Sequence, residues 1–162
     1  MDEEEGYERF FDSHYDAVRR AVTLATGDTG TAEDATAEAF ARAYRRWARV
    51  SGMDDPRAWV YVVAMNVARR TYRRRRLVPW GDRDRRSSVD VAGEATDTAA
   101  TTILLAGLTD RQRSAVVLRY LADLPYADVG RAMGCAESTA RATVHQALTR
   151  LRAEVTEATD GS

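Results

Sequence analysis

The sequence is poor in several residue types, and each shortage excludes a class of protein. Cys135 is the only cysteine among 162 residues, which rules out an internal disulfide and a zinc site built from cysteines. No apolar run approaches the roughly 20 residues that a membrane-spanning helix needs. The N-terminal segment is acidic, whereas a secretory signal starts with basic residues followed by apolar ones. We therefore expect a cytoplasmic protein with no membrane insertion.

The residues that support catalysis or metal binding are also scarce. The two histidines, His14 and His145, are far apart in the chain. Glu33, Asp34 and Glu38 could suggest a carboxylate metal site, but no histidine joins them. No glycine-rich phosphate loop and no Ser/His/Asp arrangement occurs. We expect a protein without catalytic residues, metal or cofactor, and keep an enzyme acting on nucleic acid as an alternative.

Lysine is absent, so all 24 basic side chains are arginine. We attribute this first to a GC-rich genome and only second to a preference for guanidinium groups. The net charge of -1 conceals an uneven distribution. Residues 1–40 hold eleven acids and three arginines, whereas residues 69–86 hold nine arginines and two aspartates. This asymmetry suggests one face for a protein partner and another for nucleic acid.

The first half of the chain has the periodicity of amphipathic helices. Residues 3–25 carry aromatic and aliphatic side chains at helical spacing, and residues 27–30 break the pattern. We expect Thr31 to cap a second helix, with Asp34 as its capping-box partner, and this helix to run to about Val50. The side chains of this second helix that we expect to face inward are Thr36, Phe40, Ala43, Tyr44, Trp47 and Val50.

A third helix is expected after a loop at residues 51–55. Asp55 suits its N-cap, and Pro56 suits its first position. The valine-rich run of residues 59–68 could pass for a strand, but its length and apolar spacing favour a helix. The residues that fit the helical period are Trp59, Val62, Val63, Val67 and Ala68.

The end of this third helix is strongly basic. Residues 69–76 contain six arginines together with Tyr72, and Pro79 follows as a stop signal. Arginines at a helix C-terminus suit the helix dipole, so a solvated basic cap is one interpretation. Six arginines exceed what a cap requires, and we favour phosphate binding by this block.

The chain is predicted to be all-α, with two small helical domains at residues 1–76 and 101–155. Residues 77–100 lose helical periodicity and are interpreted as a flexible linker. Residues 156–162 are polar and are expected to be a frayed tail. The inward positions expected at the start of the second domain are Ile103, Leu104, Leu105 and Leu108, then Val116, Val117, Tyr120 and Leu121.

Residues 108–152 contain the strongest local motifs of the chain. Thr109 and Gln112 match a capping box. A short helix then ends at Gly134, which suits the left-handed C-cap position, and a longer helix begins near Glu137. The stripe expected to be buried in the longer helix is Ala140, Val144, Ala147, Leu148 and Leu151. The pattern indicates a helix-turn-helix, with two helices of an ordinary bundle as the alternative.

Taken together, these segments resemble a known family. Residues 32–46 (AEDATAEAFARAYRR) and 55–76 (DPRAWVYVVAMNVARRTYRRRR) are similar to conserved region 2 of bacterial sigma factors. Residues 108–134 and 137–152 are similar to region 4. Two such regions joined by a short linker resemble the extracytoplasmic-function (ECF) group of the sigma-70 family, of the actinobacterial sigma-E-like type.

The resemblance implies a promoter-specificity subunit that binds core RNA polymerase, recognises the minus-ten and minus-thirty-five promoter elements and supports DNA melting. The partners it implies are the beta-prime clamp helices and the beta flap of the polymerase, promoter DNA and, in many members, an anti-sigma factor. A free-standing helix-turn-helix regulator that binds an operator is the alternative function. Region 2 discriminates between the two, because an ordinary repressor has no use for it.

By position, the family's contacts fall on three sets of residues. The set for the polymerase clamp is Asp34, Glu38, Arg42, Arg45 and Arg46, with a solvated helix face as the alternative. The set for the minus-ten element and the duplex upstream is Ser51, Gly52, Met53, Asp54, Asp55, Asn66, Arg69, Arg70, Arg73 and Arg74. The set for the minus-thirty-five element is Ser138, Thr139, Arg141, Ala142, His145 and Gln146. Trp59 is expected to pack in the core and not to stack on a base.

The sequence departs from the family pattern at several positions. Ala136 stands where a serine cap is usual, so the recognition helix lacks an N-cap worth about 1 kcal/mol. Thr143 and Gln146 replace residues that are commonly arginine, which predicts weaker phosphate anchoring or a different sequence choice at the upstream element. Ala37 replaces a common glutamine, and Pro56 stands where the minus-ten pocket usually has an aromatic residue.

Overall fold

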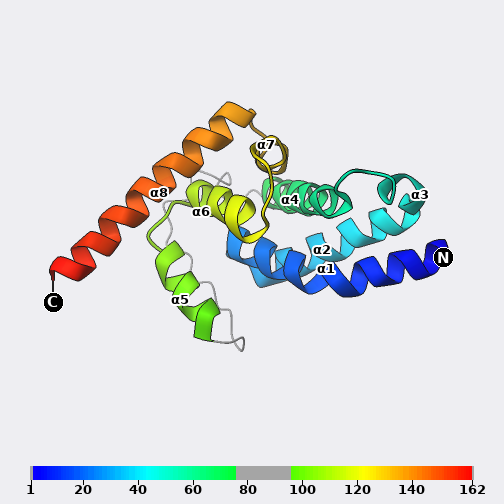
Figure 1. Ribbon diagram of the computed structural model, residues 1–162, viewed down its shortest axis with the longest axis horizontal. Coiled ribbons are helices and arrows are strands. Elements are labelled where there is room, and N and C mark those ends of the chain that lie inside the picture. Colours follow the sequence, from blue (N-terminus) through cyan, green and yellow to red (C-terminus); the bar gives the residue numbers. More distant parts are fainter. Residues whose placement is uncertain (1, 76–95, 162) are drawn as a thin grey trace.

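The structure, a computed structural model, describes residues 2–75 and 96–161. As predicted, every regular element in these residues is a helix, and the two chain ends lie far apart along the long axis (Figure 1). Within the same residues, no helix is long and apolar enough to cross a membrane. The predicted linker lies outside the described residues up to residue 95, and from Thr96 onward its positions belong to a helix.

The first half of the molecule is a small helical bundle. Its long helices are α1 (Glu3–Thr26), α2 (Thr29–Arg45) and α4 (Pro56–Arg74), and the single-turn α3 (Trp47–Val50) follows α2. Helix α2 packs against both α1 and α4. Phe40 of α2 is 1% exposed, and its ring centre lies 5.1 to 5.7 Å from the rings of Phe10, Phe11 and Tyr15 of α1. Such aromatic contacts hold the first helix pair together.

Aspartate side chains begin two of these helices. Asp28 caps α2, because its Oδ1 accepts a hydrogen bond from the backbone N–H of Thr31 at 3.0 Å. The prediction of Thr31 as the N-cap is therefore wrong, since the helix starts three residues earlier than expected. Asp55 caps α4 as predicted, accepting from the backbone N–H of Ala58 at 3.1 Å with Pro56 at the first position.

The buried faces of α2 and α4 differ in part from the expected stripes. Tyr44 is 56% exposed, because it lies at the edge of the α2 stripe against the ring of Tyr7. In α4, Val62, Val63 and Val67 are only half-buried. The small residues of the helix allow close approach to its neighbours, so its core face is formed by Ala58, Val60, Tyr61, Ala64, Met65, Ala68 and Tyr72.

The second half contains four α-helices and one π-helical turn. They are α5 (Thr96–Leu105), α6 (Asp110–Val116), the π-helical η1 (Val117–Leu121), α7 (Tyr126–Met133) and α8 (Glu137–Asp160). The capping box of α6 is confirmed, with both hydrogen bonds between Thr109 and Gln112 at 3.2 Å. Helix α8 continues to Asp160, so the expected frayed tail is helical over most of its length. Leu105 and Leu108 are buried, whereas Ile103 is 75% exposed and Leu104 49%.

The π-helical turn changes which side chains face inward. The backbone N–H of Ala122 donates to the carbonyl of Val117 at 2.9 Å, which makes the turn one residue wider than in an α-helix. Val117 and Leu118 are buried, but Tyr120 and Leu121 are each 53% exposed. The prediction that Tyr120 and Leu121 face inward is wrong, because the wider turn shifts the register of the residues that follow it.

The helix-turn-helix is formed by α7 and α8, as predicted. Gly134 closes α7 in the left-handed conformation, with φ at 71°. Ala140, Val144 and Ala147 of α8 are buried, and Leu148 and Leu151 are partly buried against the same core. The buried stripe fixes the opposite face of α8 toward solvent.

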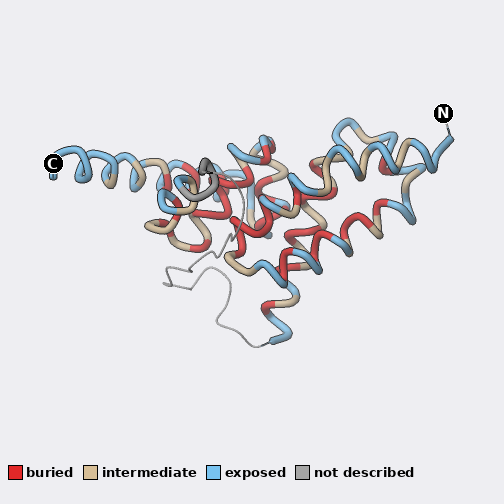
Figure 2. The backbone as a smooth tube through the Cα atoms, turned by 90° about the horizontal axis from the view of Figure 1, so that it is seen from below, coloured by how far each residue is buried: buried red, intermediate tan, exposed pale blue. Residues whose placement is uncertain are grey.

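The two halves share one hydrophobic core. Helix α4 packs against α7, and α1 packs against α6 and η1. Residues 21–26 at the end of α1 are buried on every side, because they lie between the halves. The hydroxyl of Ser114 in α6 lies 2.7 Å from the carbonyl oxygen of Ala25 in α1. Figure 2 shows the buried residues gathered in the middle of the molecule and exposed residues at both ends.

Candidate nucleic-acid and polymerase interface

The outer face of α8 presents the side chains predicted to read a DNA groove. All six predicted positions, Ser138, Thr139, Arg141, Ala142, His145 and Gln146, are exposed on the first turns of this helix. Ala136 occupies the N-cap without a side-chain hydrogen bond, as its residue type predicts. The first backbone N–H groups of α8 therefore face solvent, where they favour an anion.

Arg141 is the one cation among these six residues, and two neighbours hold its guanidinium. It lies 4.4 Å from the ring centre of Tyr126 and 3.3 Å from the Glu137 carboxylate. Arg119 of η1 lies 4.3 Å from the same ring and donates a hydrogen bond to the carbonyl of Leu124 at 3.0 Å. The Tyr126 ring thus contacts two guanidinium groups, from η1 and from α8.

Thr143 does not belong to the exposed face. It is 7% exposed, and its hydroxyl donates to the carbonyl of Thr139 at 2.8 Å. The sequence interpretation treated Thr143 and Gln146 alike as missing cations, but only Gln146 faces solvent. Position 143 therefore contributes to packing within the helix-turn-helix.

The loop at residues 51–55 is exposed apart from Met53, which is half-buried. Asp55 has a structural task, because it caps α4 and its Oδ2 lies 3.6 Å from the Arg57 guanidinium. Ser51 donates to the carbonyl of Ala48 at 3.4 Å, which ties the loop to α3. Ser51, Gly52 and Asp54 remain the accessible positions of the predicted minus-ten set in this loop.

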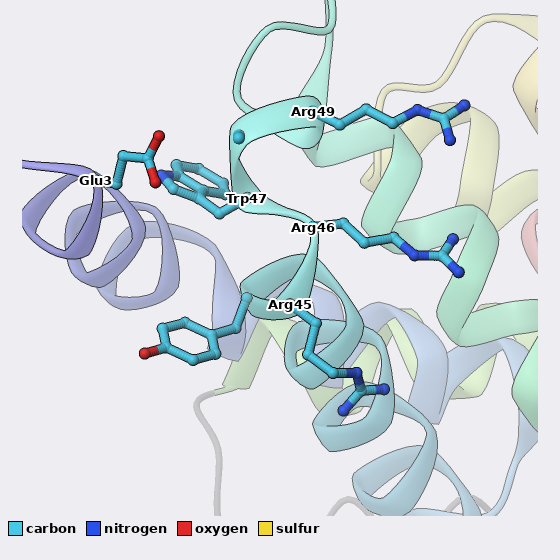
Figure 3. Close-up of a pocket in the computed structure, with 7 residues that line it drawn as sticks. Glu3, Arg45, Arg46, Trp47 and Arg49 are labelled. Atoms are coloured by element: carbon cyan, nitrogen blue, oxygen red, sulfur yellow. The ribbon is translucent and has the colours of Figure 1, made fainter.

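An open pocket of about 560 Å³ lies beside α3 at the end of α2. Its lining residues are Glu3, Tyr44, Arg45, Arg46, Trp47, Ala48 and Arg49. In Figure 3 the Trp47 indole faces Glu3, whereas Arg46 and Arg49 extend side by side in another direction. The sequence interpretation expected Trp47 to face inward, but it is half-buried and lines this pocket. Arg49, directly before the loop, is exposed.

The residues predicted for the polymerase clamp lie on α2 and at its end. Glu38 accepts a hydrogen bond from Arg42 Nε at 2.9 Å, and the Arg45 guanidinium lies 3.5 Å from the same oxygen. The hydrogen bond from Arg42, with its charge, lowers the pKa of the exposed Glu38 carboxyl. Asp34 is exposed one turn earlier. Arg46, after the helix break, points away from Arg45 (Figure 3).

The basic block at the end of α4 divides into two groups. Arg70, Arg73 and Arg74 are exposed, as phosphate contact requires. Tyr72 is only 1% exposed, and its hydroxyl donates to the carbonyl of Thr26 at 3.3 Å. The expectation that Tyr72 accompanies the arginines at a phosphate surface is therefore wrong, because this ring packs inward on α1.

Asn66 and Arg69 form the second group, and the structure places them against α7. Arg69 donates from Nε to the carbonyl of Ala132 at 3.2 Å and also hydrogen-bonds the side-chain oxygen of Asn66. Burial, followed by the charges of Arg73 and Arg70, lowers the pKa of the Arg69 guanidinium. These two predicted duplex contacts are covered by the helix-turn-helix in this arrangement.

No candidate metal-binding cluster is found in the part of the chain that the structure describes. No three His, Cys, Asp or Glu side chains within residues 2–75 and 96–161 lie close enough to hold a metal ion. Cys135 is half-buried in the turn before α8, among the residues packed against the core.

Comparison with protein families gives two matches that together cover most of the chain. Residues 10–78 match "Sigma-70 region 2", and residues 104–153 match "Sigma-70, region 4". The first match contains α1 from residue 10 onward and all of α2, α3 and α4. The second begins at the end of α5 and contains α6, η1, α7 and α8 up to residue 153. The order of the two regions is the order expected from the resemblance of the segments.

Curated relatives extend the similarity over nearly the full chain. RNA polymerase sigma-E factor of Streptomyces coelicolor is 29% identical over 151 residues, which cover 92% of this chain and 85% of the relative. ECF RNA polymerase sigma factor SigC of Mycobacterium tuberculosis is 33% identical over 132 residues, which cover 78% of this chain and 71% of the relative.

Two solved structures share the fold. The sigma factor RpoE of Bartonella quintana, determined in complex with the anti-sigma factor NepR, has a TM-score of 0.69 at 17% identity and covers 94% of this chain and 98% of its own. CnrH, determined in complex with the cytosolic domain of CnrY, has a TM-score of 0.60 at 16% identity and covers 94% and 89%. At these identities, the likeness shows the shared fold alone.

Proposed function

Because this chain belongs to the ECF group of the sigma-70 family and directs RNA polymerase to promoters, we propose which of its surfaces contact the polymerase and which contact the promoter DNA. The protein binds RNA polymerase and DNA and is not an enzyme. The proposal rests on the match to region 2 followed by region 4, each with polar or charged residues on an exposed surface. This match decides against a free-standing helix-turn-helix regulator, which lacks region 2. The compartment proposed is the cytoplasm, where bacterial RNA polymerase acts.

The α2 surface with Asp34, Glu38, Arg42 and Arg45 is the proposed contact with the clamp helices of the beta-prime subunit. Its support is a row of two acidic residues followed by two arginines along α2, in which Glu38 pairs with both arginines. Such a surface favours a polar, orientation-specific protein contact because charged rims set the register and rate of association. Arg46, which follows the end of α2 and extends in another direction than Arg45, completes this set (Figure 3).

The loop at residues 51–54 and the exposed arginines of α4 are the proposed contacts with the minus-ten element and the duplex upstream. Support comes from the exposure of Arg70, Arg73 and Arg74 near the end of α4 and of the loop residues Ser51, Gly52 and Asp54 before its start. Arginine side chains bind phosphates with forked hydrogen bonds and give a salt-dependent affinity. Asn66 and Arg69 join this surface only after α7 has moved away from them.

The outer face of α8 is the proposed reader of the minus-thirty-five element, and Arg141 is the one arginine among its six predicted positions. Ser138 and Thr139 at the start of the helix are placed to approach a phosphate together with the free backbone N–H groups. We also assign the beta flap as the polymerase contact of this half. An anti-sigma factor is a further proposed partner, as RpoE of Bartonella quintana has one.

Transcription in vitro tests the proposal as a whole. Core RNA polymerase with the purified chain is expected to start transcripts from a subset of fragments in a genomic library, and core polymerase alone is not. Mapping the start sites then gives the two promoter elements. No complex with core polymerase and no dependent transcript would overturn the proposal.

Two variants test the separate assignments of the α2 surface to polymerase and of the α8 surface to DNA. Glu38→Arg is expected to weaken core-polymerase binding about tenfold or more, because it reverses the charge that pairs with Arg42 and Arg45. Glu8→Arg, an equal charge reversal at an exposed position of α1, is the matched control and should bind normally. Arg141→Ala should weaken upstream-element recognition while leaving core binding unchanged. Equal loss in Glu8→Arg would remove the support for the α2 surface.

A further inference from the structure

The first residue of α8, Glu137, does not belong to the six positions predicted to read DNA, although it lies on the same exposed part of the helix. Its side chain is 55% exposed, and that of Arg141, one helical turn later, is 60% exposed. Arg141 Nη2 donates a hydrogen bond to Glu137 Oε1 at 3.3 Å. The ion pair therefore stands at the end of α8 that follows α7 in the helix-turn-helix (Figure 1).

Helix stability gives one reason for an acid at this position. A carboxylate in the first turn interacts favourably with the helix dipole, and a glutamate four residues before an arginine stabilises a helix further. Near DNA the same carboxylate has a cost, because it repels the phosphates that basic residues attract. Glu137 and Arg141 together carry no net charge, so this end of α8 gains little nonspecific attraction to a duplex. A hydrogen bond from a base to the carboxylate offsets this cost.

Two neighbours restrain the guanidinium of Arg141, namely Glu137 and the ring of Tyr126, whose centre is 4.4 Å away. The first residues of a recognition helix are those that reach base edges in the major groove. There guanine offers two acceptors, O6 and N7, to an arginine, and cytosine offers its N4 amino group to a glutamate. Because base pairs stack about 3.4 Å apart, two side chains in contact with each other reach the bases of one pair or of two neighbouring pairs.

We propose that Glu137 determines base specificity within the minus-thirty-five contact. Its carboxylate accepts a hydrogen bond from the N4 amino group of a cytosine, while Arg141 contacts a guanine of the same or the neighbouring base pair. The inference rests on the proposed function of α8 and adds to it the base type that the start of this helix requires. The promoters that the chain selects should therefore share a G·C pair under the start of α8.

The carboxylate distinguishes cytosine from the other bases by the hydrogen-bonding groups that each base presents. Thymine and guanine have no donor in the major groove, and their acceptor atoms repel a carboxylate. Adenine has the N6 amino group, but its neighbouring N7 acceptor repels the second carboxylate oxygen. An amide reverses this preference, because glutamine donates to N7 and accepts from N6 of the same adenine. Glu137→Gln is therefore expected to change the preferred base, whereas loss of a purely structural contact would weaken binding to every sequence alike.

Transcription from a promoter library tests the inference with the full chain and core RNA polymerase. The upstream element of a promoter that the wild-type chain uses is randomised, and each promoter variant carries a transcribed barcode that is counted. The wild type should prefer cytosine at one position by about tenfold. Glu137→Gln should prefer adenine at that position and keep the guanine preference that Arg141 provides. Glu137→Ala should lose the cytosine preference and gain no other.

Glu154→Gln is the matched control. Glu154 lies later on the same helix, and its carboxylate is 4.0 Å from Nε of Arg150, four residues away. This variant removes the same charge from a similar ion pair outside the first turns of α8, so its base preferences should equal those of the wild type. Binding of each variant to core polymerase, with the helix content measured by circular dichroism, shows that the variant is folded.

Each result either supports the inference or overturns it. Loss of the cytosine preference in both Glu137 variants, with a move to adenine in Glu137→Gln, supports it. Unchanged base preferences in both variants would overturn it, and so would an equal loss of transcription for all four bases. If the wild type starts transcripts and residue 137 has no effect on base preference, this inference alone fails. If the wild type starts no transcript with core polymerase, the proposed function fails as well.

Discussion

At the scale of single residues, the ring of Tyr126 has a position that matters for Arg141. The ring lies 4.4 Å from the Arg141 guanidinium and holds it on the outer face of α8. An exposed arginine otherwise loses about 2 kcal/mol of rotamer entropy when it is fixed on a ligand. Stacking on an aromatic ring removes part of that cost before DNA arrives.

We predict that Tyr126→Leu weakens polymerase-dependent recognition of the upstream element by roughly twofold to fivefold, the size of an exposed cation–π contact. Tyr126→Phe keeps the ring and should retain recognition. The measurement is a double-mutant cycle with Arg141→Ala, using core binding as the control for folding. Additive effects of Tyr126→Leu and Arg141→Ala would show that the ring does not act through the arginine.

His14 gives a residue-scale prediction about pH. Partial burial, and then the charge of Arg57, lowers the pKa of His14 below its usual value. The folded chain therefore binds this proton less readily than the unfolded chain, so stability falls as the pH drops through the range below about 6.5. The pKa of the Asp28 carboxyl, which caps α2 and accepts hydrogen bonds from Thr31, is also lowered. This shift affects the stability of the protein only in a more acidic range.

We expect the melting temperature of the protein to decrease between pH 7 and pH 5, and His14→Phe to make this decrease smaller. The phenylalanine ring keeps the contact with Phe10, whose ring centre lies 4.9 Å from that of His14. Calorimetry at matched ionic strength measures the difference. An identical pH dependence in the two proteins would mean that His14 does not contribute.

At the scale of elements, α8 begins without a side-chain cap. Ala136 has the extended backbone of an N-cap, with φ at -66° and ψ at 153°, but no oxygen to accept a hydrogen bond. Ala136→Ser is expected to raise the free energy of unfolding by about 1 kcal/mol, measured by urea titration. Ala142→Ser, the same change in the middle of α8, is the control and should be neutral or slightly destabilising. Equal effects at both positions would contradict the capping explanation.

The π-helical turn η1 leads to a second prediction at the scale of elements, about the free energy of unfolding. Leu118 is fully buried, although the sequence interpretation did not place it among the inward positions, and Leu121, which it did place there, is 53% exposed. Leu118→Ala should lower the free energy of unfolding by about 2–5 kcal/mol, and Leu121→Ala by less than about 0.5 kcal/mol. Chemical denaturation of both variants measures this. Similar losses would indicate a regular α-helix through residue 121.

At the scale of the whole molecule, the end of α1 couples the two halves. The carbonyl of Ala25 lies in the last turn of α1 and accepts from the Ser114 hydroxyl of α6 at 2.7 Å. Ser114→Ala leaves this buried carbonyl without that donor, at a cost of about 1–3 kcal/mol. Hydrogen exchange should then accelerate by a similar factor in the end of α1 and in α6, with α2 unchanged. Acceleration confined to α6 would show that the halves open independently.

Much of the local structure followed from the sequence because its causes are local. The capping box at Thr109, the aspartate and proline at the start of α4, and the glycine that ends α7 all act within one helical turn. The order of region 2 and region 4 could also be predicted, because it depends only on where the motifs stand along the chain. The exposed face of α8 also followed, because a buried stripe of Ala140, Val144 and Ala147 leaves only one side for solvent.

Other features depended on contacts between residues far apart in the chain. The widened turn η1 exposes Tyr120 and Leu121, and burial of Tyr72 takes it out of the basic block. Arg57 and Arg69 meet carbonyls about 65 residues away, which no periodicity could predict. The sequence by itself determined two helical regions and the residue types on their faces, because side-chain spacing sets amphipathicity. Only the tertiary structure decided that one half covers part of the predicted DNA surface of the other, because the pairing of arginines with helix ends arises from packing.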